Sequence, residues 1–219
     1  MSQRERSART RRLIMEAAGA VFAERGYEGT AISEIYNRVG MTKGAFYFHF
    51  AGKLELAQAV LASQVDEESG PIVPRERKLQ EMCDAGLVFA YQLARDPMLQ
   101  GSIRLSLEPG IPGLDPQLPF RSWIEFNRAA LTAAHDNDEL LPDLDLPAIA
   151  EMFVGCFSGL QLLSQAMDGR QKLEERVAFW LSQVLTSIAR PEIRGEIDLS
   201  PGRAAAVLAE AQALHGSAS

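Results

Sequence analysis

Side chains capable of catalysis are few and scattered along this sequence. The three histidines, His49, His135 and His215, stand far apart and form neither an HExxH motif nor a His/Cys cluster of the kind that binds zinc. In the segment 155–159 the serine stands one place too late for the G-x-S-x-G nucleophile elbow. No Walker loop or GxGxxG motif occurs. We therefore expect no catalytic residue, no metal site and no cofactor, and a helical small-molecule enzyme is the less favoured alternative.

A short segment near residue 45 carries the chemistry of nucleic-acid recognition instead. Lys43, Gly44 and Tyr47 share one face of a predicted helix, while Phe46 and Phe48, with Ala45, pack inward or touch thymine methyl groups. A glycine is costly inside a helix, and Gly44 is explained if the helix backbone lies close to DNA. His49 and Lys53 follow where phosphates would pass. The alternative is an aromatic core stripe beside a solvated lysine, which leaves Gly44 and Tyr47 unexplained.

Helices with short glycine turns are predicted to position this segment. Apolar spacing predicts an amphipathic helix over about Arg9–Arg25, followed by short helices over Ile32–Val39 and Lys43–Phe48. Lys53 opens a fourth helix that runs to about Val65. Two short helices joined by a glycine turn match the helix-turn-helix pattern, with threonines as N-caps. The expected DNA-binding residues are Thr30, Thr42, Lys43, Gly44, Tyr47, His49 and Lys53.

Charge is distributed unevenly over the 219 residues, whose formal net charge is −7. Residues 1–53 carry a net charge of +4 and residues 54–219 a net charge of −11. This asymmetry indicates a polyanionic partner at one end of the chain or a merely solvated basic face. The N-terminal arginines (Arg4, Arg6, Arg9, Arg11 and Arg12) either form an arm that contacts DNA or belong to a disordered tail.

Cysteine usage and hydropathy indicate the compartment. Cys83 and Cys156 form no CxxC pair or disulfide framework, which is typical of a reducing environment. No uninterrupted apolar run approaches the roughly 20 residues that cross a bilayer. We therefore expect a cytoplasmic protein without membrane contact.

The C-terminal block is predicted to be helical as well, so the expected fold class is all-α. Helices are predicted over 75–95, 98–107, 120–135, 145–167 and 173–189, with a proline-rich loop over 109–119. The last two of these helices are more apolar than one buried face requires. They predict a four-helix bundle across the two-fold axis of a homodimer, or else a helix pair buried within one subunit. A dimer would hold two reading helices about 34–36 Å apart and would read an inverted-repeat operator.

Three features of this block bear on ligand binding. Gly155 and Gly159 open one helix face, for close helix packing or for a ligand cavity. Trp123 either covers a flat ligand ring or packs as an ordinary core residue. Gln64 lies on the fourth helix, where it forms a hydrogen bond to a ligand or is simply solvated.

Longer stretches of the chain resemble a known family. Residues 26–35 (GYEGTAISEI) and 39–50 (VGMTKGAFYFHF) resemble the tetracycline-repressor (TetR) family. Residues 101–107 (GSIRLSL), 119–123 (PFRSW) and 154–159 (VGCFSG) resemble its γ-butyrolactone receptor subgroup. The resemblance implies an N-terminal three-helix helix-turn-helix domain over residues 1–53. It also implies a larger helical domain for ligand binding and dimerisation over residues 54–219.

The function that the resemblance implies is that of a dimeric repressor of secondary-metabolite (antibiotic) genes. Its expected partners are a double-stranded DNA operator, a second copy of the chain and a small hydrophobic signalling ligand, a γ-butyrolactone or butenolide that releases the operator. Gln64, Trp123 and Cys156 match ligand-contacting positions of the subgroup. The alternative is a receptor-like homologue that responds to an antibiotic, a biosynthetic intermediate or several drugs.

Overall fold

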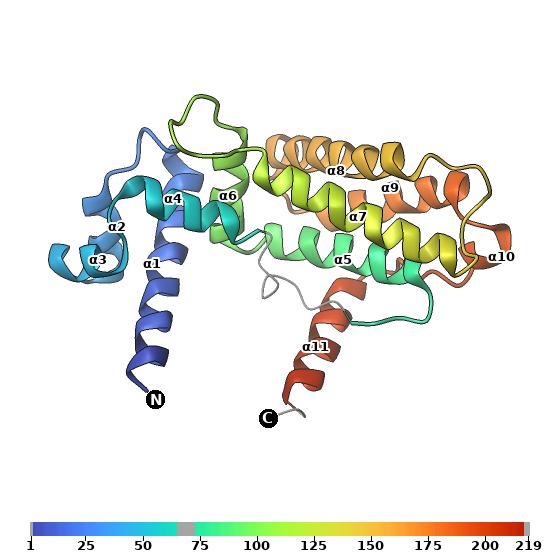
Figure 1. Ribbon diagram of the computed structural model, residues 1–219, viewed down its shortest axis with the longest axis horizontal. Helices are drawn as coiled ribbons and strands as arrows, with labels where there is room; N and C mark the ends of the chain where they lie inside the picture. The colour runs from blue at the N-terminus through green and yellow to red at the C-terminus, as the bar shows by residue number, and fades with distance from the viewer. Residues whose placement is uncertain (1, 65–72, 217–219) are drawn as a thin grey trace. The chain divides into compact units, whose positions relative to one another are not determined.

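The computed structural model describes residues 2–64 and 73–216, and within these ranges every regular element is a helix. An isolated antiparallel bridge joins Leu140 to Ala189. The expected all-α class is therefore confirmed (Figure 1).

The described helices form two compact units. The first contains α1 (Gln3–Arg25), α2 (Ile32–Val39), α3 (Lys43–His49), α4 (Lys53–Ala62) and α6 (Pro97–Leu107). The second contains α5 (Lys78–Leu93), α7 (Leu118–Asp136), α8 (Leu146–Asp168), α9 (Leu173–Ile188), α10 (Pro191–Arg194) and α11 (Arg203–Gly216).

The boundary between the two units differs from the predicted domain boundary after residue 53. Both α4 and α6 pack on α1, so they belong to the first unit, while α5 lies between them in the sequence and belongs to the second. The segment that follows the helix-turn-helix therefore shares its core. The functional division into residues 1–53 and 54–219 stays a prediction.

The core of the first unit holds the helix-turn-helix in place. Ile14, Ala18 and Phe22 repeat at helical spacing along α1 and are fully buried, because this stripe faces the other helices. Ile35 of α2 and Phe46 of α3 join the same core. Replacing a buried phenylalanine by alanine costs about 3–5 kcal/mol, so these contacts fix where the two short helices lie.

Local signals set the ends of these helices largely as predicted. Gly40 ends α2 in the left-handed region at φ 74°. The Thr42 hydroxyl then caps α3 by accepting a hydrogen bond from the Ala45 amide at 3.2 Å. The proposed N-cap at Thr30 is wrong: α2 begins after Ala31, which makes no side-chain cap. The Thr30 hydroxyl instead donates to the carbonyl of Gly26 at 2.6 Å and is buried.

The first helix begins earlier than its hydrophobic pattern predicts. A capping box between Ser2 and Glu5 starts α1 at Gln3, so Arg4 and Arg6 lie on a helix. The alternative of a disordered tail is therefore wrong for these two arginines, and their contact with DNA stays a prediction. At the other end of the unit α4 stops at Ala62, and the predicted end at Val65 lies outside the described residues.

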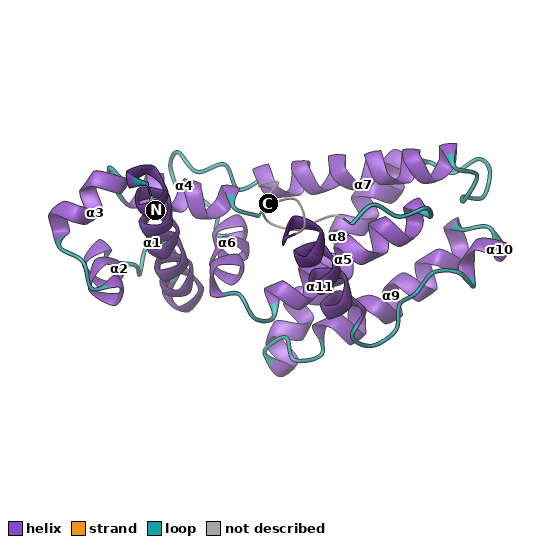
Figure 2. Ribbon diagram, turned by 90° about the horizontal axis from the view of Figure 1, so that it is seen from below, coloured by secondary structure: helices purple, strands orange, loops and turns teal. Residues whose placement is uncertain are grey.

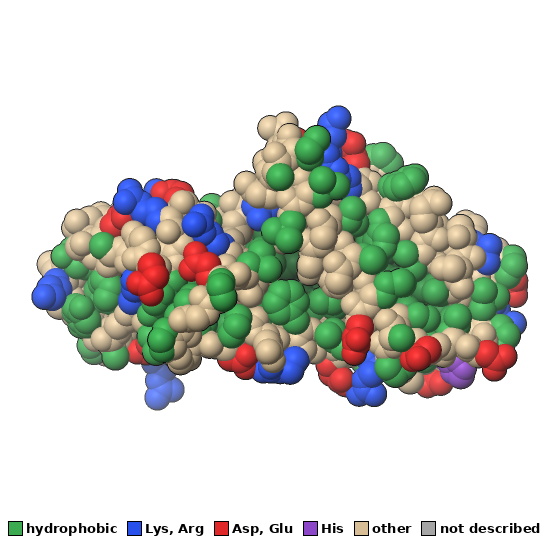
Figure 3. Space-filling model, turned by 90° about the horizontal axis from the view of Figure 1, so that it is seen from above, with side chains coloured by type: hydrophobic (Ala, Val, Ile, Leu, Met, Phe, Trp, Pro, Cys, Tyr) green, Lys and Arg blue, Asp and Glu red, His purple; other side chains and the backbone are tan. Residues whose placement is uncertain are grey.

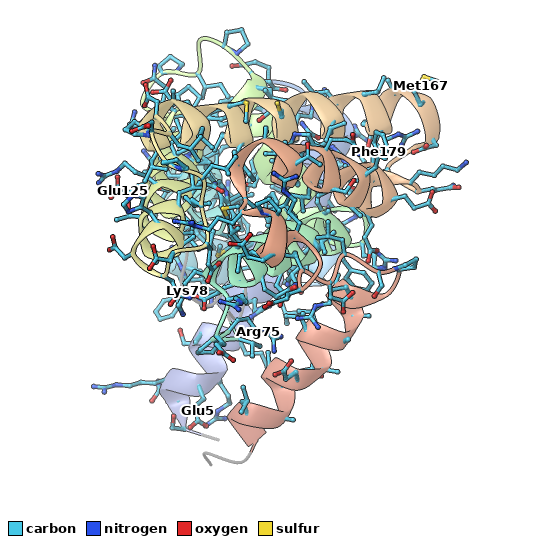
Figure 4. The ribbon with its side chains drawn as sticks, turned by 90° about the vertical axis from the view of Figure 1, so that its right-hand side faces the viewer. Glu5, Arg75, Lys78, Glu125, Met167 and Phe179 are labelled. Carbon is cyan, nitrogen blue, oxygen red and sulfur yellow. The ribbon has the colours of Figure 1, made fainter. Side chains whose placement is uncertain are left out.

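The second unit is built around α5, which packs on α9 and α11 (Figure 2). At its N-terminus the fully buried carboxylate of Glu139 accepts the amides of Lys78 and Leu79, both at 2.7 Å. Asp84, also buried, binds the guanidinium groups of Arg75 and Arg203. These contacts fasten α11 to α5, and Arg75 is labelled in Figure 4.

Sequence analysis missed α10 and α11. The buried residues of α11, Ala204, Val207 and Ala211, repeat at helical spacing and could have revealed this helix. They were overlooked because alanines contribute little to a hydrophobic pattern. By length and composition α8 is apolar enough to cross a membrane, and it is the one such helix among those described. A single helix of this kind is weak evidence for membrane insertion, because core helices of soluble proteins pass the same test.

Candidate DNA-binding face and ligand site

The outward face of α3 presents side chains to solvent. Lys43, Gly44 and Tyr47 are exposed, and Tyr47 leaves 44% of its surface open although the centre of its ring lies 5.3 Å from that of Phe46 in an edge-to-face arrangement. The ammonium of Lys43 lies 6.0 Å from the centre of the Tyr47 ring. A methyl group added at Gly44 would meet nothing within 4 Å. The folded chain therefore gives no reason for a glycine there, as expected if a partner's surface comes close.

Phe48 faces away from the core. Of its two expected places, packing inward is therefore wrong, and contact with thymine methyl groups stays a prediction. Its side chain is 81% exposed, whereas that of Phe46 is fully buried. The difference follows from helix geometry, because successive residues point about 100° apart, and Phe48 falls on the same ridge as Gly44 four positions earlier. Its ring meets only the edge of His49 at 5.2 Å among the described ring contacts. Phe48 is therefore part of the outward face.

Arg11 anchors the C-terminal end of α3 to α1. Its guanidinium donates to the carbonyl of His49 at 2.8 Å and lies 4.0 Å from the centre of the Phe50 ring. This places His49, which is half-buried, at the edge of the exposed face. Arg11 thus has a structural partner, whereas Arg9 and Arg12 remain exposed on α1.

Two of the predicted DNA-binding residues are engaged inside the unit. The Lys53 ammonium donates to the carbonyls of Tyr27 at 2.9 Å and Thr30 at 3.1 Å, and it lies 4.4 Å from the centre of the Tyr27 ring. Thr30 has only 4% of its surface exposed. Neither residue is presented like Lys43 and Tyr47, and their contacts with DNA stay predictions.

A cluster of aromatic side chains surrounds Trp123 in the second unit. Its ring lies 4.8 Å from Phe89 of α5 and 5.5 Å from Phe126 of α7, and Phe89 in turn lies 5.4 Å from Phe157 of α8. The indole nitrogen of Trp123 is buried and has no hydrogen-bond partner within the described part of the chain. A buried N–H without an acceptor is costly, so this group is suited to a ligand oxygen.

The other two predicted ligand residues lie in different surroundings. Gln64 is buried, and its side-chain amide donates to the Ser102 hydroxyl at 2.6 Å, so its alternative of simple solvent exposure is wrong. Cys156 is a free, half-buried thiol next to Phe157 on α8. Burial raises the pKa of the other thiol, Cys83, which therefore stays protonated and unreactive. Because Gln64 belongs to the first unit and Trp123 to the second, their joint role stays a prediction.

The exposed side of α8 and α9 is strongly apolar. Met167 is 70% and Phe179 68% exposed, and Figure 4 shows both at the same side of the second unit. A methyl group added at Gly155 or Gly159 would meet nothing within 4 Å, so within one chain neither glycine serves the close packing that was expected. Figure 3 shows further hydrophobic side chains on the surface of the second unit. The exposed large hydrophobic residues of these two helices are Met152, Leu162, Leu163, Met167 and Phe179.

Sequence reasoning did not find the aromatic partners of Trp123 or the role of Ser102. Phe89, Phe126 and Phe157 lie on three different helices, and no spacing within one segment shows that they meet. Ser102 had a local signal, since a polar residue on the apolar side of α6 requires a partner.

Comparison with known proteins identifies the class of protein. The family profile described as "Bacterial regulatory proteins, tetR family" matches residues 14–60, which span the helix-turn-helix. The A-factor receptor protein of Streptomyces griseus is 36% identical over 211 residues, covering 91% of this chain and 73% of that protein. The chain belongs to the TetR family of bacterial transcriptional regulators. It is accordingly a regulator and not an enzyme.

Solved structures narrow the resemblance within the family. Full-length native TylP, a TetR regulator from Streptomyces fradiae, is 45% identical with a TM-score of 0.86, and the match covers 94% of this chain and 99% of TylP. A gamma-butyrolactone receptor (ArpA-like protein) is 26% identical with a TM-score of 0.65, over 94% of this chain and 98% of that chain. The chain is thus similar to receptors of this subgroup, as residues 101–107, 119–123 and 154–159 indicated.

Proposed function

We propose that the chain is a ligand-responsive repressor that binds an inverted-repeat operator as a homodimer in the cytoplasm. The exposed face of α3, on which Gly44 meets no other group among the described residues, is the observation that carries this proposal. Lys43 supplies charge for phosphates or base acceptors, Tyr47 supplies a ring and a hydroxyl, and Gly44 allows close approach. Similarity to the A-factor receptor supports the class of repressor that controls antibiotic genes.

The apolar side of α8 and α9 is proposed to form the dimer interface. Side chains such as Met167 and Phe179 are too exposed for a stable monomer surface, and Gly155 and Gly159 allow a second copy of α8 to come close. This face also explains why α8 is apolar without contacting a membrane. To read an inverted repeat, such a homodimer needs its two α3 helices about one turn of DNA apart, roughly 34–36 Å.

A γ-butyrolactone-type ligand is proposed to bind among the aromatic side chains around Trp123. The unpartnered indole N–H can donate to a lactone or keto oxygen, and the surrounding rings cover the apolar part of such a molecule. Cys156 lies next to Phe157 on α8, and a contact between Gln64 and the ligand stays a prediction. A ligand that prefers the conformation with separated α3 helices weakens operator binding, and a hundredfold loss requires about 2.7 kcal/mol of preference.

DNA binding is tested by footprinting the DNA upstream of the protein's own coding sequence and measuring affinity by fluorescence anisotropy. We expect Lys43→Ala and Tyr47→Ala each to weaken operator binding about tenfold or more, because base and phosphate contacts contribute about 1–3 kcal/mol. Both variants should keep the dimer and the unfolding midpoint. A parallel loss of folding would place these residues in the core instead of at the DNA.

The interface is tested by sedimentation velocity. Met167→Glu combined with Phe179→Glu should give monomers, because two charges would be buried in an apolar contact. Leu214→Glu is the matched control, since Leu214 is also exposed but lies on α11. A dimer that survives the double substitution would refute the interface.

The ligand site is tested with A-factor as the probe in an operator-release titration. Trp123→Phe keeps an aromatic ring and removes the N–H, so operator affinity should stay unchanged while release requires about tenfold more A-factor. If A-factor releases the operator from Trp123→Phe at the same concentration as from the unsubstituted protein, the indole N–H does not bind the ligand.

A further inference from the structure

Helix α6 lies between α5 and α7 in the sequence but packs against α1 and α4. The segment 94–96 joins it to α5, and the loop over 108–117 joins it to α7. Those two helices carry Phe89 and Trp123 of the aromatic cluster. Nevertheless α6 packs within the unit that contains the helix-turn-helix.

Close backbone packing joins α6 to α1. A Cβ atom at Gly101 of α6 would overlap the carbonyl oxygen of Gly19 of α1, and one at Gly19 would overlap the Met98 backbone. The two helices cross with their backbones in contact, and α1 packs more extensively on α6 than on its other neighbours. Interiors of this density resist sliding, so the pair moves as one block.

Side chains at the C-terminal end of α6 hold the last turn of α1. Arg104 donates to the carbonyls of Ala23 at 2.9 Å and Glu24 at 3.3 Å, which lack partners within the helix at its end. Arg104 also pairs with Glu108 at 3.3 Å. The other carboxylate oxygen of Glu108 accepts the Tyr27 amide at 2.7 Å.

The backbone of Tyr27 is therefore held on both sides by hydrogen bonds. Its N–H donates to the Glu108 carboxylate, which follows α6, and its carbonyl accepts from the Lys53 ammonium of α4. Residues 26–31 lead directly into α2, so the position of this turn determines where the helix-turn-helix begins. Gly26 has a positive φ of 71°, a backbone conformation that residues with a Cβ rarely adopt. The backbone of this turn therefore favours a glycine.

We propose that Glu108 is a positioning residue for operator binding, which sets the orientation of the helix-turn-helix by holding the Tyr27 amide. The inference rests on the proposed function and adds a residue that positions the reading helix within the first unit. A second contact also holds α6 in this unit: the Ser102 hydroxyl accepts from the Gln64 side-chain amide and donates to the Leu61 carbonyl.

Two conservative substitutions at Glu108 separate the effect of side-chain length from the effect of side-chain charge. Glu108→Asp keeps the charge but shortens the side chain by one methylene, so the Tyr27 amide loses its acceptor. Glu108→Gln keeps the reach and an acceptor oxygen but removes the charge. We expect Glu108→Asp to bind the footprinted operator about tenfold more weakly, with an unchanged salt slope because no phosphate contact is lost. Glu108→Gln should bind within about twofold of the unsubstituted protein.

Controls distinguish this role from general destabilisation. Glu24→Ala removes the side chain of another ion pair between α1 and α2, the 3.0 Å contact with Arg38, and keeps the Glu24 backbone carbonyl that Arg104 contacts, so operator affinity should stay within about twofold. Hydrogen exchange of the Tyr27 amide should accelerate in Glu108→Asp and stay slow in Glu108→Gln. Circular dichroism confirms that each variant is folded.

The possible outcomes point to different conclusions. Affinity unchanged in both variants, despite faster exchange at Tyr27, would show that the contact is merely structural and would overturn the inference. Tighter binding by Glu108→Gln with unchanged binding by Glu108→Asp would assign the effect to charge repulsion from DNA and would also overturn it. Failure of the unsubstituted protein to bind any duplex refutes the proposed function itself, and the inference falls with it.

Discussion

Replacing Gly44 by alanine should make the protein more stable and a worse DNA binder. The residue lies in the first turn of α3 with ordinary helical backbone angles, and an added methyl group meets nothing within 4 Å. Alanine is preferred over glycine in helices by up to about 1 kcal/mol, so the free energy of unfolding should rise by about 0.5–1 kcal/mol. Operator affinity should fall at least about tenfold, or about 1.4 kcal/mol, because the methyl group occupies the space of the approaching groove.

Urea unfolding and fluorescence anisotropy on the same preparations measure the two effects. Gly195→Ala is the matched control, because its added methyl group also meets nothing within 4 Å but the residue lies in the second unit. It should leave operator affinity unchanged. Operator binding by Gly44→Ala equal to that of the unsubstituted protein would refute the reasoning, since the glycine would then serve neither the fold nor the DNA.

Two further predictions concern buried and paired charges in the second unit. Asp84→Asn should lower the free energy of unfolding by about 3–5 kcal/mol in urea titrations, because Arg75 and Arg203 lose a buried counter-charge. Hydrogen bonding to Arg176 chiefly lowers the pKa of Asp168 to about 2. The unfolded value is about 3.9, so this contribution is present above pH 4 and is lost as the pH falls toward 2. Acid unfolding followed by circular dichroism should show this loss, and Arg176→Met should weaken it.

Local signals in the sequence were sufficient for most of the helices. The apolar spacing of α1, the cap at Thr42 and the left-handed turn at Gly40 are properties of neighbouring residues, and the structure confirms them. Helix ends that depend on weak signals were less accurate. The capping box at Ser2 was overlooked beside the hydrophobic pattern, and α11 has an alanine-rich face.

The roles of individual polar residues required the folded chain. Lys53 was expected where phosphates would pass; its ammonium donates to the carbonyls of Tyr27 and Thr30, and its contact with DNA stays a prediction. Gln64 was expected to bind a ligand or to be solvated; it is buried, and its amide donates to Ser102, which lies 38 residues away in the sequence. Which hydrogen-bond partners these side chains find depends on how the helices cross. The spacing of residues within one helix does not predict them.

Periodicity and caps in the sequence by itself determined the all-helical class, and the resemblance of residues 26–35 and 39–50 indicated the TetR family of DNA-binding regulators. Only the tertiary structure decided that α6 belongs with the DNA-binding helices, that Phe48 faces outward and that the Trp123 indole nitrogen is buried with no hydrogen-bond partner in the described part of the chain. The physical reason is that burial and hydrogen bonding depend on which distant segments pack together. These contacts join residues far apart in the sequence, so local sequence patterns do not predict them.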